Sequence, residues 1–283
     1  MAVDPLLAVA NRALFRLGAK SIVSLDEDTD RARVCQAEAA ECRQETLRAF
    51  PWNFARKRAL LNGLAQTSVV PSIEALTVDA LATFTTAAPI FVVGQDEGAR
   101  LIGTSGGLAR IATVTDTQTV TARIETVFPS TAPIAAEQWR LAPGWEWEFR
   151  YPKPAGYLRL AMVQGVSLKN PGSSVLWSWW RDLKDEPEPV KIEDQFLVSN
   201  AGAKLHIAYT QDVADILKWD ALSKSALAAQ LAYRICYAVT GSLQASKTQH
   251  DAFKEILAEA RTMDSQEGSL DNAGSDILLT VRW

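Results

Sequence analysis

Apolar positions repeat with a helical period at the start of the chain. Asp4 and Pro5 form a cap and first-turn signature, and Gly18 follows the last apolar position of the stripe Leu6, Val9, Ala10, Ala13, Leu14 and Leu17. A second helix is expected to begin after a cap at Asp28 or Thr29 and to end before Pro51. One stripe of this helix is rich in small residues, which suits close helix packing, either inside one chain, the favoured interpretation, or between subunits. It consists of Ala32, Cys35, Ala39, Cys42, Thr46 and Ala49. The pattern predicts a helical hairpin over residues 4–50.

The same period returns near the end of the chain. One stripe ends at Gly241 and consists of Leu222, Ala226, Ala229, Tyr233, Cys236 and Thr240. The next consists of Phe253, Ile256, Leu257, Ala260 and Met263. We expect these two helices to complete the bundle that begins at residue 4.

The middle of the chain has strand character. Residues 64–141 are rich in Thr, Val, Ala and Gly, and residues 120–127 alternate between apolar and polar positions. Turns are expected at Gly106-Gly107 and at Thr115–Gln118. This range is therefore expected to form a small antiparallel sheet or barrel inserted into a helical protein.

Tryptophan is concentrated after this range. Six of the nine tryptophans fall within residues 139–180, and the spacing of Trp145/Trp147 and of Trp177/Trp179 is typical of strands. Core packing, a sugar-binding platform and a protein interface all fit this cluster. Asp185–Pro189 is expected to be an exposed acidic loop. Phe196–Ser199 and Lys204–Thr210 are expected to pair as a hairpin.

The chain ends in a short alternating segment. A polar stretch containing Gly268 and Gly274 precedes it, and its apolar positions are Ile277, Leu279, Val281 and Trp283. A strand of this kind needs a sheet edge to pair with. We therefore predict that these four residues bind a partner protein by pairing with the edge of one of its sheets.

Together these elements predict an α+β fold. The expected architecture is a helical bundle with an antiparallel sheet and an inserted small β-domain. The expected ranges are 1–63 for the N-terminal helical hairpin, 64–141 for the insert, and 142–283 for β-hairpins and C-terminal helices that complete the core. The last range includes a flexible strand tail at 264–283.

Charge and composition exclude several classes. The 283 residues carry 29 basic and 33 acidic side chains, a net charge of −4, which disfavours a broad basic face for nucleic acid. No apolar run reaches the ~20 residues of a membrane span, and the N-terminus shows no secretory pattern. Cys35 and Cys42 lie about 10.5 Å apart along a helix, beyond the ~7 Å limit of a disulfide. With Cys236, they are expected to be reduced core thiols.

Motifs for catalysis and cofactors are weak. The three Cys and two His lack zinc-site spacing, and no phosphate-binding glycine loop is present, so neither a metal nor a cofactor is expected. Gly103–Gly107 matches G-x-S-x-G with Ser105 as a candidate esterase nucleophile, but a strand is expected to follow where that motif needs a helix. A glycine turn is the favoured interpretation.

Two groups of charged residues are expected to lie on the surface without a catalytic or DNA-binding role. Glu146 and Glu148 are expected to face solvent on a strand rather than to form a glycosidase pair. Arg56-Lys57-Arg58 is expected to be a solvated face or to pair with the carboxylates of Asp26–Asp30, rather than to bind DNA phosphates.

Several segments in order resemble the tail tubular protein A family, the head-to-tail adaptors of short-tailed bacteriophages. The N-terminal ones are Ala13–Gly18, Ser21–Leu25, Ala32–Phe50 and Pro51–Ala55. The C-terminal ones are Tyr151–Arg159, Leu205–Tyr209 and the helix pair Leu222–Arg261. The resemblance leaves out the β insert, which is itself similar to small β modules of phage tail proteins.

The resemblance implies a structural virion protein without enzymatic activity. Family members form a homo-oligomeric ring, commonly of twelve copies, which binds the portal protein and the tail nozzle or tube protein. Double-stranded DNA passes through the ring without specific binding, and no membrane is involved. The implied location is the neck of the virion, after assembly in the host cytoplasm. Sugar or receptor binding through the insert and the tryptophan cluster is the alternative function.

Overall fold

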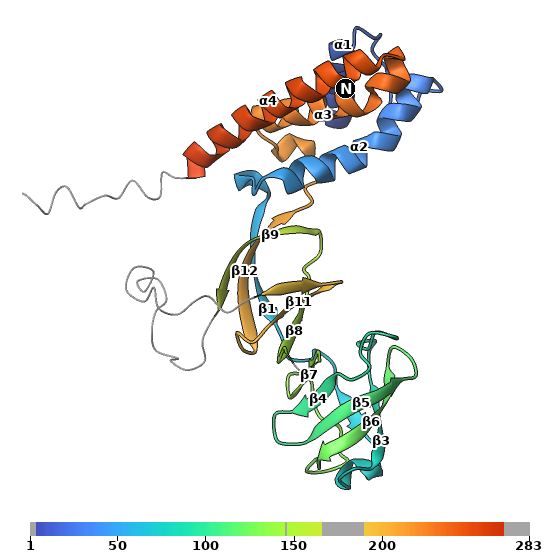
Figure 1. The fold of residues 1–283 in the computed structure, drawn as a ribbon, viewed down its shortest axis with the longest axis vertical. Helices are drawn as coiled ribbons and strands as arrows, with labels where there is room; N and C mark the ends of the chain where they lie inside the picture. Colours follow the sequence, from blue (N-terminus) through green and yellow to red (C-terminus); the bar gives the residue numbers. More distant parts are fainter. Residues whose placement is uncertain (1–3, 145, 166–189, 269–283) are drawn as a thin grey trace, which may run out of the picture. The chain divides into compact units, whose positions relative to one another are not determined.

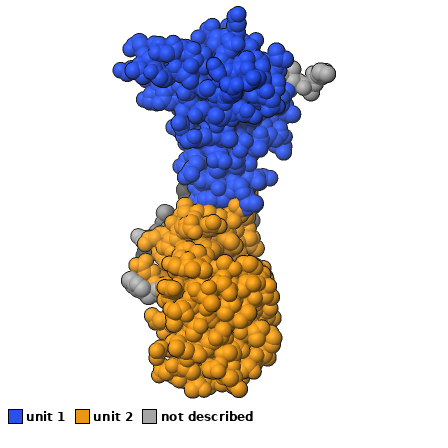
Figure 2. All heavy atoms as spheres, turned by 90° about the vertical axis from the view of Figure 1, so that its right-hand side faces the viewer, with its two compact units in different colours: residues 1–57, 155–161, 208–283 blue, residues 58–154, 162–207 orange. Residues whose placement is uncertain are grey.

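The structure is a computed structural model that describes residues 4–144, 146–165 and 190–268, and its fold is α+β (Figure 1). The chain divides into two compact units (Figure 2). We call them the helical unit, within residues 1–57, 155–161 and 208–283, and the β unit, within residues 58–154 and 162–207. Each unit is assembled from segments that are distant in the sequence.

The helical unit contains four α-helices: α1 (Pro5–Arg16), α2 (Asp30–Ala49), α3 (Ala221–Thr240) and α4 (Leu243–Gly268). Local hydrogen bonds explain where they begin. The Asp4 carboxylate accepts from the Leu6 N–H at 2.9 Å, and the Thr29 hydroxyl accepts from the Ala32 N–H at 3.3 Å. Gly241, at φ +71°, ends α3 in the left-handed conformation. The predicted caps and the glycine stop are confirmed.

One core joins the N-terminal and C-terminal helices, as the sequence predicted. Its buried members include Leu14, Cys35, Leu47, Leu227 and Leu257. The hairpin predicted for residues 4–50 is wrong in one respect: α1 and α2 hardly contact each other, and each packs mainly against α3. The reason is that α3 is buried around most of its circumference, so it offers apolar surface to several neighbours.

A six-stranded antiparallel sheet forms the larger part of the β unit, in the order β2-β3-β6-β5-β4-β7. Its strands are β2 (Val69–Pro71), β3 (Leu81–Thr86), β4 (Arg100–Gly103), β5 (Leu108–Val114), β6 (Thr119–Thr126) and β7 (Trp139–Ala142). Along β6, Val120, Ala122 and Ile124 are buried as the alternation predicted. A short 3-10 helix, η2 (Ile73–Leu76), packs against β3.

Two three-stranded sheets complete the strands of the described residues. One has the order β10-β11-β8, from Lys191–Glu193, Phe196–Ser199 and Phe149–Pro152. The other has the order β1-β12-β9, from Arg56–Asn62, Lys204–Gln211 and Tyr157–Gly165. The predicted hairpin of residues 196–210 is therefore wrong. Both strands form, but β11 pairs with β8 and β10, while β12 belongs to the other sheet.

Two further expectations need correction. Residues 146–148 form a turn before β8, so Trp147, Glu146 and Glu148 do not lie on a strand. Helix α4 continues to Gly268, so residues 264–268 are not part of a strand tail. The end of α4 is fastened by Asp264, whose carboxylate accepts from the Asn53 N–H at 3.1 Å.

Some predicted features lie outside the described residues. They are Trp145, Trp177, Trp179, Trp180, the loop Asp185–Pro189 and the terminal segment from residue 269 to 283.

Candidate interaction surfaces and a polar pocket

The predicted partner-binding residues Ile277, Leu279, Val281 and Trp283 lie outside the described residues. Their role as a docking strand stays a prediction, and the described surfaces have to be judged without them.

The G-x-S-x-G motif lies in the turn between β4 and β5. The predicted strand follows it as β5, so the strand-turn-helix setting of a nucleophile elbow is not formed. Packing explains why one position of this motif has to be glycine. A Cβ atom on Gly107, which has φ +94°, would lie 2.4 Å from Cδ1 of the Phe128 ring. Ser105 is exposed at the tip of this turn, while His250 packs against Tyr233 in the helical unit, with ring centroids 4.6 Å apart and the ring planes tilted by 32°.

The three cysteines are free and buried, as the sequence predicted. Burial raises the pKa of the Cys35 thiol to about 11 and that of Cys42 to about 12, so very little reactive thiolate forms near neutral pH. Within the described ranges, no three His, Cys, Asp or Glu side chains are placed to hold a metal ion. None of the described helices is both long and apolar enough to span a bilayer.

Exposed apolar side chains gather at one end of the six-stranded sheet. Main-chain hydrogen bonds bring its segments together: the Phe128 N–H donates to the Ala75 carbonyl at 3.1 Å, and the Asp79 N–H donates to the Ile124 carbonyl at 2.8 Å. We call this surface the apolar end. It consists of Ile73, Leu76, Val78, Leu81 and Val127, each at least 41% exposed. Such a group of apolar side chains is typical of a protein contact.

The helical unit also exposes large apolar side chains. Phe15 at the end of α1 is 83% exposed, and Leu243 at the start of α4 is 70% exposed. Val23, Leu217 and Tyr237 are exposed as well. Sequence reasoning missed these residues and the apolar end. The sequence shows only that these residues are apolar, and buried core residues are apolar too, so residue type does not reveal which of them are exposed.

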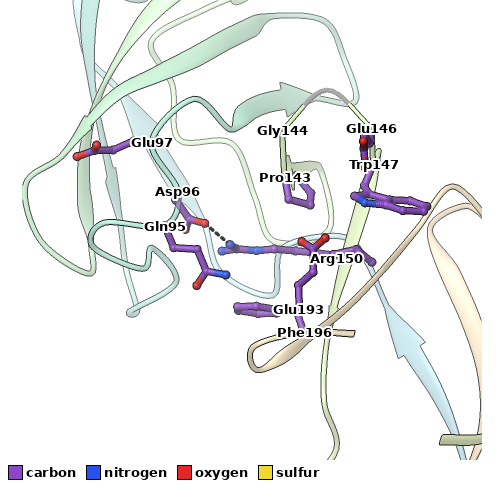
Figure 3. A pocket seen from close by; sticks show the side chains of 11 residues that line it. Gln95, Asp96, Glu97, Pro143, Gly144, Glu146, Trp147, Arg150, Glu193 and Phe196 are labelled. Carbon is purple, nitrogen blue, oxygen red and sulfur yellow. Dashed lines mark hydrogen bonds and ion pairs between the residues drawn. The ribbon is translucent and has the colours of Figure 1, made fainter. Parts of the chain in front are cut away.

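A pocket of about 280 Å³ opens in the β unit (Figure 3). Its walls come from four separate stretches: residues 95–97, the turn between β7 and β8, Arg150 on β8, and the β10-β11 pair. The Arg150 side chain crosses the pocket toward Asp96, as the dashed line in Figure 3 shows.

Arg150 and Asp96 form a buried ion pair at the floor of this pocket. Their side chains are only 7% and 3% exposed. The second Arg150 nitrogen donates to the Ile90 carbonyl at 2.8 Å, and the second Asp96 oxygen accepts from the Val92 N–H at 2.9 Å. The guanidinium carbon also lies 4.4 Å from the centre of the Phe196 ring. These contacts fasten the loop before β4 to the β10-β11-β8 sheet.

The rest of the lining is acidic and aromatic. Glu97, Glu146 and Glu193 add three carboxylates, and Trp147 and Phe196 add two rings. In addition to Arg150, the Lys191 ammonium is close by: it lies 3.7 Å from a Glu146 oxygen and 5.2 Å from the centre of the Trp147 ring. The pocket as a whole is therefore suited to neutral or cationic groups and repels anions.

No protein-family model matches the chain, and no curated protein matches it significantly.

Proposed function

We propose that this chain is a structural adaptor subunit of a short-tailed bacteriophage, which joins the portal to the tail nozzle or tube as part of a homo-oligomeric ring. The observation that carries the proposal is the exposure of large apolar side chains on both compact units, at the apolar end and around Phe15 and Leu243. The family resemblance of the N-terminal and C-terminal segments outside the β insert supplies the identity of the partners.

Two separate contact surfaces suit a protein that connects others. Each fully buried apolar side chain contributes about 1.5–3 kcal/mol, so a few such residues on each unit are enough to drive association. A cyclic ring needs two different faces on every subunit for its neighbours, and an adaptor needs further surface for the proteins above and below it. A chain with two independently packed units can meet both needs.

Charge supports a passive role in genome ejection. A channel for DNA functions best when it does not hold phosphates, and a subunit with a net charge of −4 repeated around a ring repels them. In this proposal the protein acts by binding other proteins, without catalysis, in the virion neck.

Electron microscopy of the purified protein mixed with portal tests the proposal. Rings seated on the portal are expected. Deletion of residues 275–283 is expected to leave a folded subunit that no longer joins the portal, and unchanged joining would contradict the docking role of Ile277, Leu279, Val281 and Trp283.

The apolar end has its own test. The substitutions Ile73→Ser and Leu81→Ser together are expected to leave the fold intact and to weaken binding to the tail protein or to neighbouring subunits at least tenfold, because burial of two apolar side chains is lost. Val93→Ser is the matched control, since Val93 is an exposed apolar residue of the β unit outside the apolar end. A protein that binds neither portal nor tail protein would contradict the adaptor function.

A further inference from the structure

We propose that the polar pocket of the β unit binds a neutral polyhydroxylated ligand, namely one sugar ring of a glycan. The proposal does not depend on the adaptor function, because the pocket includes neither the apolar end nor the terminal segment.

The first requirement on the ligand comes from Trp147. This side chain lines the pocket and is only 7% exposed, and its indole N–H has no acceptor among the described residues. Figure 3 shows the indole nitrogen on the side of the ring that faces Pro143. A buried donor without a partner costs about 1–3 kcal/mol, so a ligand that supplies an acceptor after a small shift of the ring would recover that free energy.

The second requirement comes from the carboxylates. Glu193 lines the same pocket and takes part in no ion pair within the described parts of the chain, whereas the exposed Glu97 side chain points away from Arg150 and Trp147 (Figure 3). Ionised carboxylates only accept hydrogen bonds, so the ligand has to donate. The negative charge also excludes phosphates, sulfates and acidic sugars.

A hydroxyl group meets both requirements, because it accepts from an N–H and donates to a carboxylate. An ammonium or guanidinium group satisfies the carboxylates but leaves the indole N–H unpaired. An apolar ligand satisfies neither. A small molecule with several hydroxyl groups therefore matches the hydrogen-bonding groups of this pocket better than a cation does.

Shape and rigidity agree with this assignment. Pro143 and the edge of the half-buried Phe196 ring, one face of which lies against the Arg150 guanidinium, provide apolar surface for the C–H groups of a sugar ring. A volume of about 280 Å³ is at the lower limit of small-molecule pockets, which suits one ring rather than a long chain of them. The buried pair of Arg150 and Asp96 holds the floor in place before the ligand arrives.

Saturation-transfer NMR on the full chain tests the proposal, with a panel of neutral methyl glycosides at concentrations up to tens of millimolar. Transfer to the ring protons of at least one glycoside is expected. Glu193→Gln and Trp147→Phe are each expected to weaken that binding about tenfold or more, since each removes one hydrogen bond to the ligand. Glu74→Gln, an exposed carboxylate on η2 outside the pocket, is the matched control and is expected to change nothing.

Three results would overturn the proposal. They are no transfer to any glycoside of the panel, binding that is unchanged in Glu193→Gln, and competition by arginine methyl ester that is stronger than by any glycoside. Glu193 is only half-buried, so its substitution keeps the test valid if Trp147→Phe fails to fold. Portal binding by Glu193→Gln is expected to be normal, which separates this proposal from the adaptor function.

Discussion

Replacement of Asp96 by alanine removes one half of the buried ion pair with Arg150. The Arg150 side chain, which is 7% exposed in the wild type, would lose its carboxylate partner and keep the Ile90 carbonyl and the Phe196 ring. Loss of one partner of a buried pair costs about 3–5 kcal/mol because the other charge is left uncompensated. We therefore expect Asp96→Ala to destabilise the β unit by about 4 kcal/mol.

A double variant tests whether the uncompensated charge of Arg150 causes this loss of stability. If the cost arises from the orphaned guanidinium, Asp96→Leu combined with Arg150→Met should destabilise less than either single substitution, because apolar replacement of both partners is often neutral. The exposed ion pairs of Arg33 with Asp28 and Asp30 are the control, and Arg33→Ala should cost no more than about 1 kcal/mol.

Amide hydrogen exchange along β8 is the appropriate assay, because it reports the opening of the β unit separately from the helical unit. A cost below about 1 kcal/mol for Asp96→Ala would refute the reasoning. So would a double variant whose cost equals the sum of the two single costs.

Three further predictions follow from local contacts. Burial raises the pKa of Cys35 to about 11 and of Cys42 to about 12, so at pH 8 a maleimide should label these thiols only after denaturation, and rapid labelling of native protein by mass spectrometry would contradict their burial. Burial also raises the pKa of Asp264 above its ordinary 3.8, so the folded state favours the protonated form and this group's contribution to stability falls as pH rises from about 4 through the folded pKa. The variant Asp264→Asn should therefore gain stability relative to the wild type over that range in urea titrations, and a constant difference would refute the shift. Gly107→Ala should lower the melting temperature more than Gly106→Ala, since both glycines have positive φ but only a Cβ at Gly107 meets an aromatic ring, and equal effects would show that the clash relaxes.

The sequence alone determined the elements whose causes are local. The Asp4 and Thr29 caps and the glycine after α3 act through hydrogen bonds and backbone angles within a few residues, so their positions follow from residue type. The buried alternation along β6 and the turn before β5 were predictable for the same reason.

Tertiary structure decided which of these elements meet. Strand β11 pairs with β8 instead of β12, and α1 packs on α3 instead of α2, because such choices depend on apolar surface buried between distant segments, which residue spacing does not encode. The pocket around Arg150 draws on four stretches between residues 95 and 198. The apolar end exists because no other part of the described chain covers its five side chains. Exposure of an apolar residue is a property of the packed molecule, so the sequence could predict helices and strands here but not which apolar side chains stay exposed.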